Sequence, residues 1–113
     1  MTPHGLEESW RKTTEYLRDA RSDLPEAAED ICHDEIAQFE EFLEHNELEL
    51  ALDSLEVALL KFEHKNLRVL ELMTQAALNM GLEQHAARYR ATIIETERAI
   101  EERWQKRSQD DNV

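Results

Sequence analysis

The chain has 113 residues and a formal net charge of −13, with only two glycines and two prolines. This length suits one domain. Alanine, glutamate, lysine, leucine and arginine make up 59 of the residues, about half, which is typical of long helices. The charge disfavours binding to nucleic acid or to an anionic membrane and favours cationic partners. We expect an all-α antiparallel bundle of about five helices, with one domain over residues 1–108 and a frayed tail over residues 109–113.

The negative charge is concentrated in one part of the sequence. Residues 22–60 contain 13 acidic side chains and no lysine or arginine, whereas acidic and basic residues balance in the rest of the chain. A block of one sign either keeps a protein soluble or attracts a cationic partner. Solubility needs far less charge, so the excess favours a binding role.

The sequence carries no sign of export or of membrane insertion. Its first residues lack the basic and apolar regions of a signal peptide, and no stretch is long and apolar enough to cross a bilayer. The single cysteine, Cys32, has no partner for an intramolecular disulfide. These features predict a cytoplasmic protein.

The first two helices are expected over residues 6–21 and 25–44. Apolar residues recur every three or four positions in the first, which ends at the helix-breaking residues 22–25. Pro25 suits the first turn of the second helix, where a missing N–H does no harm. The apolar stripe of the second helix comprises Ala28, Cys32, Ile36, Phe39 and Leu43.

The third helix is expected to run from Asn46, as its N-cap, to about Phe62. Its main stripe is leucine-rich, but Leu50, Val57 and Leu60 add apolar surface on other sides. A helix of this kind needs more than one face covered.

The last two helices are expected over residues 67–80 and 83–106. The fourth is apolar nearly all round, which is typical of a central position, and Gly81 suits the left-handed residue after its end. The fifth exceeds the third by about 10 Å at about 1.5 Å per residue. Its end should therefore overhang or pack on the first helix, with Trp10 and Trp104 as candidates for that contact.

The sequence lacks the motifs that usually indicate catalysis or the binding of a metal or cofactor. The sequence has no glycine-rich phosphate loop, no cysteine pair for zinc and no paired Glu-x-x-His motif for a di-iron site. Cys32 lies on an apolar stripe among acidic residues, where a cysteine behaves as a small hydrophobe and the thiolate is disfavoured. We expect no catalytic residue, no metal and no cofactor.

The acidic side chains of the second and third helices are the candidate binding surface. They recur at helical spacing on both helices, so an antiparallel pair would bring the two rows into one field around residues 44–49. The residues expected to bind the partner are Asp30, Asp34, Glu40, Glu41, Glu44, Glu49, Asp53 and Glu56.

A family resemblance supports this view. The stretch from Ile36 to about Tyr89, roughly half of the chain, resembles small helical immunity proteins. Its centre is residues 42–55, where His45-Asn46-Glu47 is followed by the Ala-Leu-Asp-Ser-Leu that ends at Leu55, and Met80-Gly81-Leu82 ends a later helix. These belong to bacterial polymorphic toxin systems, including those of contact-dependent growth inhibition and the Maf type. The resemblance implies a cytoplasmic protein that binds one cognate toxin domain and blocks it.

The charge adds a class of toxin to this expectation. A nuclease with a basic active-site cleft, an RNase or a DNase, would be occluded by an acidic surface. We expect a monomer or weak dimer that binds neither nucleic acid nor membrane. The alternatives are an acidic helical chaperone or adaptor, which would dimerise and shield several basic clients, and a structural module with Trp10 and Trp104 at its interfaces.

Overall fold

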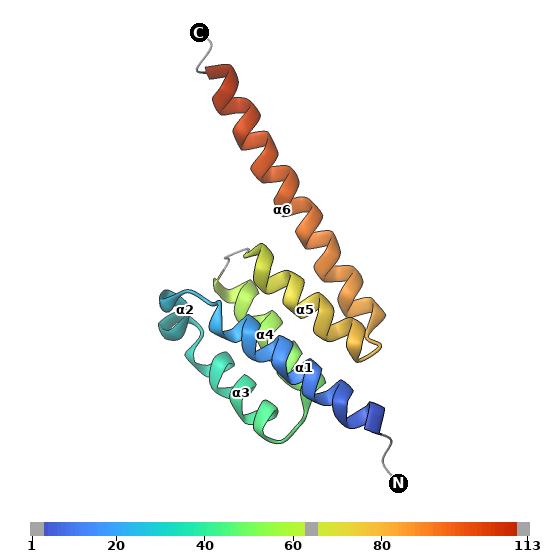
Figure 1. Ribbon diagram of the computed structural model, residues 1–113. Helices are drawn as coiled ribbons and strands as arrows, with labels where there is room; N and C mark the ends of the chain where they lie inside the picture. Colours follow the sequence, from blue (N-terminus) through green and yellow to red (C-terminus); the bar gives the residue numbers. More distant parts are fainter. Residues whose placement is uncertain (1–3, 63–65, 111–113) are drawn as a thin grey trace.

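The computed structural model describes residues 4–62 and 66–110, and this part of the chain consists of helices and the short connections between them, without strands (Figure 1). The expected all-α bundle is confirmed. It has six helices in place of five, because the second expected helix is divided in two. The helices are α1 (His4–Ser22), α2 (Glu26–Ile31), α3 (His33–Glu44), α4 (Leu48–Phe62), α5 (Leu67–Asn79) and α6 (Glu83–Asp110).

The bundle is built from two helical hairpins and α1. Short turns join α3 to α4 and α5 to α6, and α5 packs between α1 and α6. The start of α1 meets the end of α5 through Ser9 and Asn79, and Asn66, before α5, meets Asp23, after α1. These contacts make α1 and α5 antiparallel and confirm the central position expected for the fourth helix.

The core takes its large side chains from five helices. Leu17, Phe39, Leu52, Leu55 and Met73 are almost completely buried and come from α1, α3, α4 and α5, and Tyr89 adds a buried ring from α6. A second, smaller cluster lies under the junction of α2 and α3. It comprises Ala28, Cys32, Ile36 and Ala58.

The break between α2 and α3 lies at Cys32. Its φ of −113° and ψ of 29° are not helical, although the hydrogen bonds of the helix continue on both sides, from Cys32 N to Ala28 O and from Ile36 N to Cys32 O. The thiol of Cys32 donates to the carbonyl oxygen of Ala58 in α4. The apolar stripe predicted for one helix is thus kept across two, and the periodicity gives no sign of the break.

The two hairpin turns have the same construction. After α5, Gly81 has a φ of +73°, and the N–H groups of Gly81 and Leu82 donate to the carbonyls of Leu78 and Ala77, as in a Schellman motif. This confirms the role expected for Gly81. After α3, Asn46 takes the same place with a φ of 57°. The prediction of Asn46 as an N-cap is therefore wrong, because the residue closes α3 from the left-handed region that asparagine tolerates.

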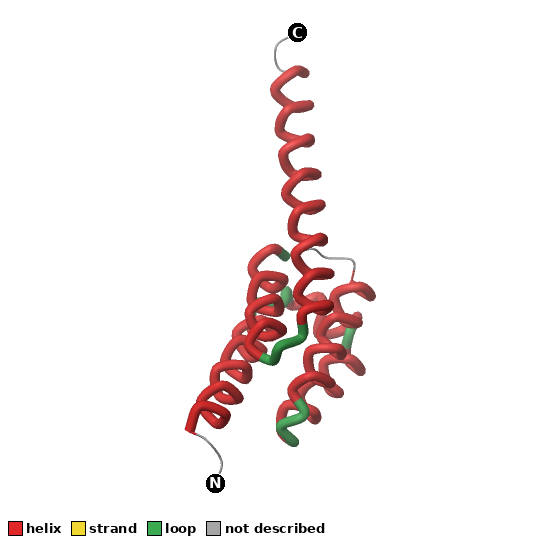
Figure 2. Tube along the Cα trace, turned by 90° about the vertical axis from the view of Figure 1, so that its right-hand side faces the viewer, coloured by secondary structure: helices red, strands yellow, loops and turns green. Residues whose placement is uncertain are grey.

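The C-terminal half of α6 projects from the bundle (Figures 1 and 2). The radius of gyration is 16.5 Å, whereas a compact domain of this length has about 13 Å. The expected overhang is confirmed. The expected contact between Trp10 and Trp104 is wrong, because Trp104 lies on the projecting half and Trp10 lines a pocket at the start of α1. Residues 109 and 110 of the expected tail belong to α6, and residues 111–113 lie outside the described part.

Candidate partner-binding surface

The eight predicted carboxylates lie on three helices. Asp30 is on α2, four are on α3, and Glu49, Asp53 and Glu56 are on α4. The first six in the sequence are exposed, and Asp53 and Glu56 are partly buried. The structure does not gather all eight into one field, since three of them turn towards other helices and pair with basic side chains there.

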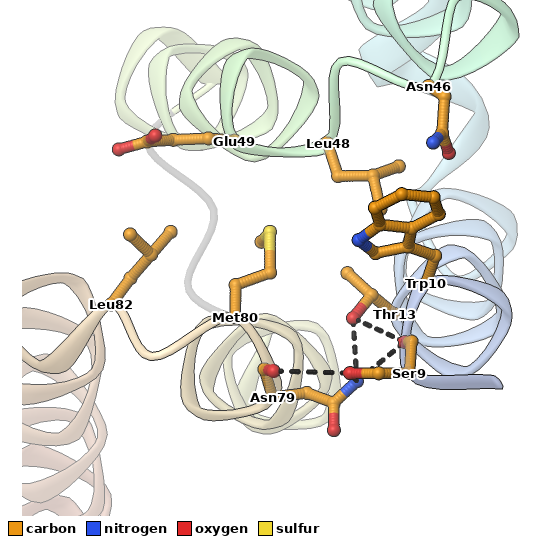
Figure 3. Close-up of a pocket in the computed structure, with 9 residues that line it drawn as sticks. All are labelled: Ser9, Trp10, Thr13, Asn46, Leu48, Glu49, Asn79, Met80 and Leu82. Carbon is orange, nitrogen blue, oxygen red and sulfur yellow. Dashed lines mark hydrogen bonds between the residues drawn. The ribbon is translucent and has the colours of Figure 1, made fainter. Parts of the chain in front are cut away.

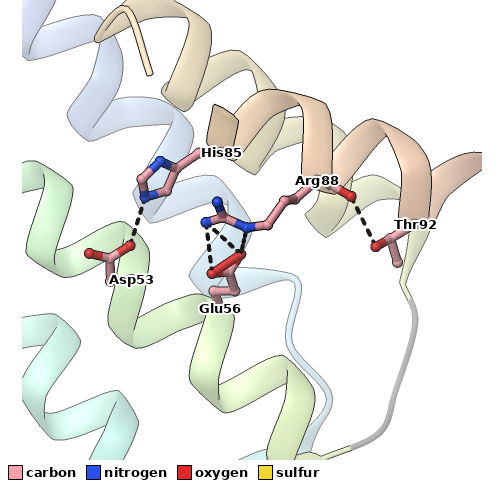
Figure 4. A network of polar contacts seen from close by, with 5 residues as sticks. All are labelled: Asp53, Glu56, His85, Arg88 and Thr92. Carbon is pink, nitrogen blue, oxygen red and sulfur yellow. Dashed lines mark hydrogen bonds and ion pairs between the residues drawn. The ribbon is translucent and has the colours of Figure 1, made fainter. Parts of the chain in front are cut away.

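Two of these three join α4 to α6 (Figure 4). Nε2 of His85 lies 2.9 Å from an oxygen of Asp53, and the guanidinium of Arg88 meets both oxygens of Glu56 at 3.2–3.4 Å. The contact with Glu56 raises the pKa of Arg88. Asp53 and Glu56 therefore hold α6 against α4 and are not free for a partner.

A buried tyrosine completes this junction. The guanidinium carbon of Arg88 lies 6.0 Å from the ring centroid of Tyr89, within the range of a cation–π contact. Burial, followed by the nearby charge of Glu56, raises the pKa of Tyr89. The Tyr89 ring is part of the core, and the ion pair of Arg88 and Glu56 lies on its outer side. This junction therefore has a structural role.

The third paired carboxylate is Glu40. Arg21, near the end of α1, forms ion pairs with Glu29 at 2.7 Å and with Glu40 at 3.3 Å. One guanidinium thus ties α1 to α2 and α3. Part of the negative charge of Glu40 is balanced within the fold.

The remaining carboxylates near the α3–α4 turn have no basic partner among the described residues. Glu41, Glu44 and Glu49 are exposed, and Glu47, which was not among the predicted residues, lies between them. We call these four residues the acidic turn. It is the part of the predicted field that the structure brings together.

His45 reports the negative potential of the acidic turn. Its Nδ1 lies 2.9 Å from the carbonyl oxygen of Glu41. This hydrogen bond, and then the charges of Glu44, Glu41 and Glu47, raise the pKa of His45. The carboxylates of Glu44, Glu41 and Glu47 thus add to the effect of the hydrogen bond in favouring the protonated form of His45.

A pocket adjoins the acidic turn, where α1, α4 and α5 meet (Figure 3). Its volume is about 380 Å³, and Trp10 forms one wall while Met80 and Leu82 lie across from it. Glu49 and Asn46 stand on the α4 side of the opening. We call this hollow the Trp10 pocket.

A polar network joins α1 to α5 in the lining of the Trp10 pocket, beside Trp10. Nδ2 of Asn79 donates to the backbone carbonyl of Ser9 at 2.7 Å and to Oγ1 of Thr13 at 2.7 Å. Thr13 in turn donates to the Ser9 carbonyl at 3.0 Å. The pocket was missed at the sequence level because its lining comes from three separate segments, and Glu49 alone among the lining residues was predicted to bind a partner.

Beside the acidic turn, the outer side of α4 is partly apolar. Leu50, Val57 and Leu60 are exposed although α1, α2, α3 and α5 all pack against other parts of α4. The sequence predicted that α4 needs more than one face covered. The structure covers only part of its apolar surface.

Cys32 lies apart from this surface, buried under the junction of α2 and α3. Burial, followed by the charge of Glu35, raises the pKa of the Cys32 thiol, as its apolar and acidic setting predicted. In residues 4–62 and 66–110, no three histidine, cysteine or carboxylate side chains gather as metal ligands would. Within the same residues, no helix combines the length and hydropathy of a membrane span.

Comparisons with family models, with curated proteins and with solved structures find no match to this chain.

Proposed function

We propose that this protein is a cytoplasmic immunity protein that binds a cationic toxin domain and blocks it. The observation that carries the proposal is the acidic turn, where Glu41, Glu44, Glu47 and Glu49 are exposed without a basic partner in the described part of the chain. After its hydrogen bond to the Glu41 carbonyl, the charges of Glu44, Glu41 and Glu47 also raise the pKa of His45, which is consistent with a negative potential at this turn. The resemblance of residues 42–55 to helical immunity proteins supports the class of partner.

The mechanism is inhibition by occupation. A concentrated negative field speeds the encounter with a basic surface and disfavours wrong partners. A nuclease toxin holds its phosphate substrate with basic side chains. Carboxylates placed over these side chains compete with the substrate directly, so one bound copy per toxin domain is sufficient.

The Trp10 pocket offers an anchor for this contact. Binding energy at interfaces is concentrated in a few residues, often aromatic or arginine side chains in desolvated hollows. An arginine of the partner would stack on the Trp10 ring in a cation–π contact, and the charge of Glu49 at the other side of the opening would favour its approach. Met80 and Leu82 would receive its aliphatic part.

The test starts with co-purification of the protein with the products of neighbouring genes. A single basic toxin domain retained at one-to-one stoichiometry is the expected result. Glu44→Lys/Glu49→Lys should then slow association by about tenfold or more at low salt, with unchanged helicity. The matched control is Glu15→Lys/Glu71→Lys, which changes the net charge equally at exposed sites on α1 and α5. Equal association rates for both variants would contradict the assigned surface.

A second candidate function is a chaperone or adaptor for basic clients. It is favoured by the exposed apolar side chains Leu50, Val57 and Leu60 on the outer side of α4, because a chaperone binds apolar segments of partly unfolded clients. Retention of several unrelated basic proteins, all weakened by Val57→Ser/Leu60→Ser, would favour this function. Retention of one folded toxin domain would favour immunity.

A further inference from the structure

The C-terminal half of α6 projects away from the other helices. Among the side chains of α6 that the structure describes, Thr96 is the last buried one, and every side chain from Glu97 to Ser108 is exposed. Residues 97–110 extend for about 21 Å at about 1.5 Å per residue, and in both views they stand clear of the bundle (Figures 1 and 2). Helices of about this length are marginal in water on their own.

This segment has an apolar face. Ile93, Glu97, Ile100, Trp104 and Arg107 follow one another at alternating spacings of four and three residues, which places them along one line of the helix. The exposed fraction is 40% for Ile100 and 66% for Trp104. A tryptophan and an isoleucine on one line of a free helix are typical of a helix–helix contact.

The charges along the segment are divided into an acidic block followed by a basic block, and this order favours a particular partner. Residues 95–102 contain four glutamates and one arginine, and residues 103–107 contain Arg103, Lys106 and Arg107 without an acid. An antiparallel second copy places each acidic block beside a basic block, whereas a parallel copy places like charges together. The macrodipoles of the two helices also favour the antiparallel arrangement.

We propose that the projecting half of α6 pairs with the same segment of a second copy, as an antiparallel helix pair centred near residue 102. In this register Ile100 of each copy packs against Trp104 of the other, and Glu97 of each copy faces Arg107 of the other. Each contact occurs twice, as the symmetry of an isologous dimer requires. The overlap ends close to Thr96 in both copies, so the two bundles lie at opposite ends of the pair without collision.

The dimer does not depend on the proposed function. The acidic turn and the Trp10 pocket lie in the bundle, at the end away from the projecting half of α6 (Figure 1). Both copies can therefore hold a partner at the same time. Loss of the dimer would leave the toxin-binding surface intact, and the reverse also holds.

The first test is the mass of the full chain in solution, measured by light scattering and sedimentation equilibrium over a wide concentration series. We expect a dimer that Trp104→Glu converts to a monomer without unfolding the bundle. Ile94→Glu is the matched control, because Ile94 is exposed on α6 about 100° away from the seam. A monomer at every concentration, or equal effects of the two variants, would overturn the proposal.

The charge pair provides a test by rescue. Glu97→Arg and Arg107→Glu should each weaken the dimer, since each places like charges together twice. The double variant exchanges the two charges and should restore the dimer to within a few-fold of its original dissociation constant. Failure of the double variant to recover would overturn the register.

The direction of pairing is tested with spin labels. Cys32 is buried, so a cysteine introduced at exposed Ala91 is the residue that reacts. Antiparallel pairing centred at residue 102 separates the two labels by about 33 Å along the axis. A separation close to the width of two helices would indicate parallel pairing and overturn the proposal.

Discussion

The thiol of Cys32 donates a hydrogen bond to the carbonyl oxygen of Ala58 at a distance of 3.2 Å. The contact ties the non-helical residue between α2 and α3 to the middle of α4. It also buries the one cysteine of the chain completely. Burial keeps reagents away from the sulfur of Cys32, and its raised pKa keeps the thiol protonated and therefore unreactive.

We predict that the Cys32 thiol reacts with a soluble disulfide reagent only when the bundle opens. Burial raises its pKa, so the reactive thiolate is scarce as well as inaccessible. The rate of reaction, followed by absorbance, should be slow in buffer and rise steeply across the denaturant transition. Cys32→Ala gives the blank. Rapid reaction of the folded protein would show that the α2–α3 junction is open.

The ion pair between Arg88 and Glu56 should stabilise the fold modestly. The two side chains are 51% and 25% exposed, and pairs at such positions contribute about 0.2–1 kcal/mol. A double-mutant cycle with Glu56→Ala and Arg88→Ala, followed by denaturant unfolding, measures this coupling free energy. It should decrease as salt is added. A coupling free energy of zero at low salt would mean that this ion pair does not help to hold α6 against α4.

His45 gives a pH-dependent contribution to stability. Its pKa is raised above 6.5 in the folded protein by the Glu41 carbonyl and the surrounding carboxylates. Stabilisation by the protonated ring is therefore complete below the unfolded pKa and is lost as pH rises through the folded pKa. An NMR titration should place the midpoint above 6.5, with His45→Gln identifying the signal. The stability difference between the native protein and this variant should shrink over the same rise in pH.

The same signal tests the proposed partner. A cationic protein bound to the acidic turn cancels the field of Glu44 and Glu47 and should lower the His45 pKa. A midpoint that stays unchanged in the complex would indicate that the partner binds elsewhere.

Gly81 should tolerate no side chain without a cost. Its φ of +73° is unfavourable for other residues although no atom would meet an added Cβ. Gly81→Ala should therefore lower the free energy of unfolding by about 1–2 kcal/mol through the backbone alone. Gly5→Ala is the matched control, because Gly5 is helical, exposed and equally uncrowded. It should be neutral or slightly stabilising, and an equal loss in both variants would contradict this explanation.

Periodic features of the sequence predicted most of the fold. The spacing of the apolar residues was sufficient to predict the helices. Gly81 identified the α5–α6 turn because glycine is the residue that most readily takes the left-handed conformation at the end of a helix. The break at Cys32 had no such signal, since the stripe continues through it and the thiol finds its acceptor on another helix. Asn46 was placed in the right turn with the wrong role, because asparagine suits both an N-cap and a left-handed C-terminal residue.

The candidate site was less predictable for a physical reason. Sequence spacing identifies the side of a helix that carries charge, but it does not identify which charges are balanced by other helices. Asp53 and Glu56 meet His85 and Arg88, about 32 residues further along the chain. The Trp10 pocket likewise depends on how α1 meets α5. Three of the four carboxylates of the acidic turn were predicted, because they are local in sequence, and Glu47 between them was missed.

The projecting half of α6 also changes how the molecule moves through solvent. With extents of 69 × 30 × 19 Å, even a single copy has the friction of a rod-like particle. It should leave a gel-filtration column early and give an apparent mass above its 13.3 kDa. Its rotational diffusion should be anisotropic, so NMR relaxation rates should differ between amides along α6 and those of helices that cross its axis. Elution volume alone would thus mistake shape for self-association.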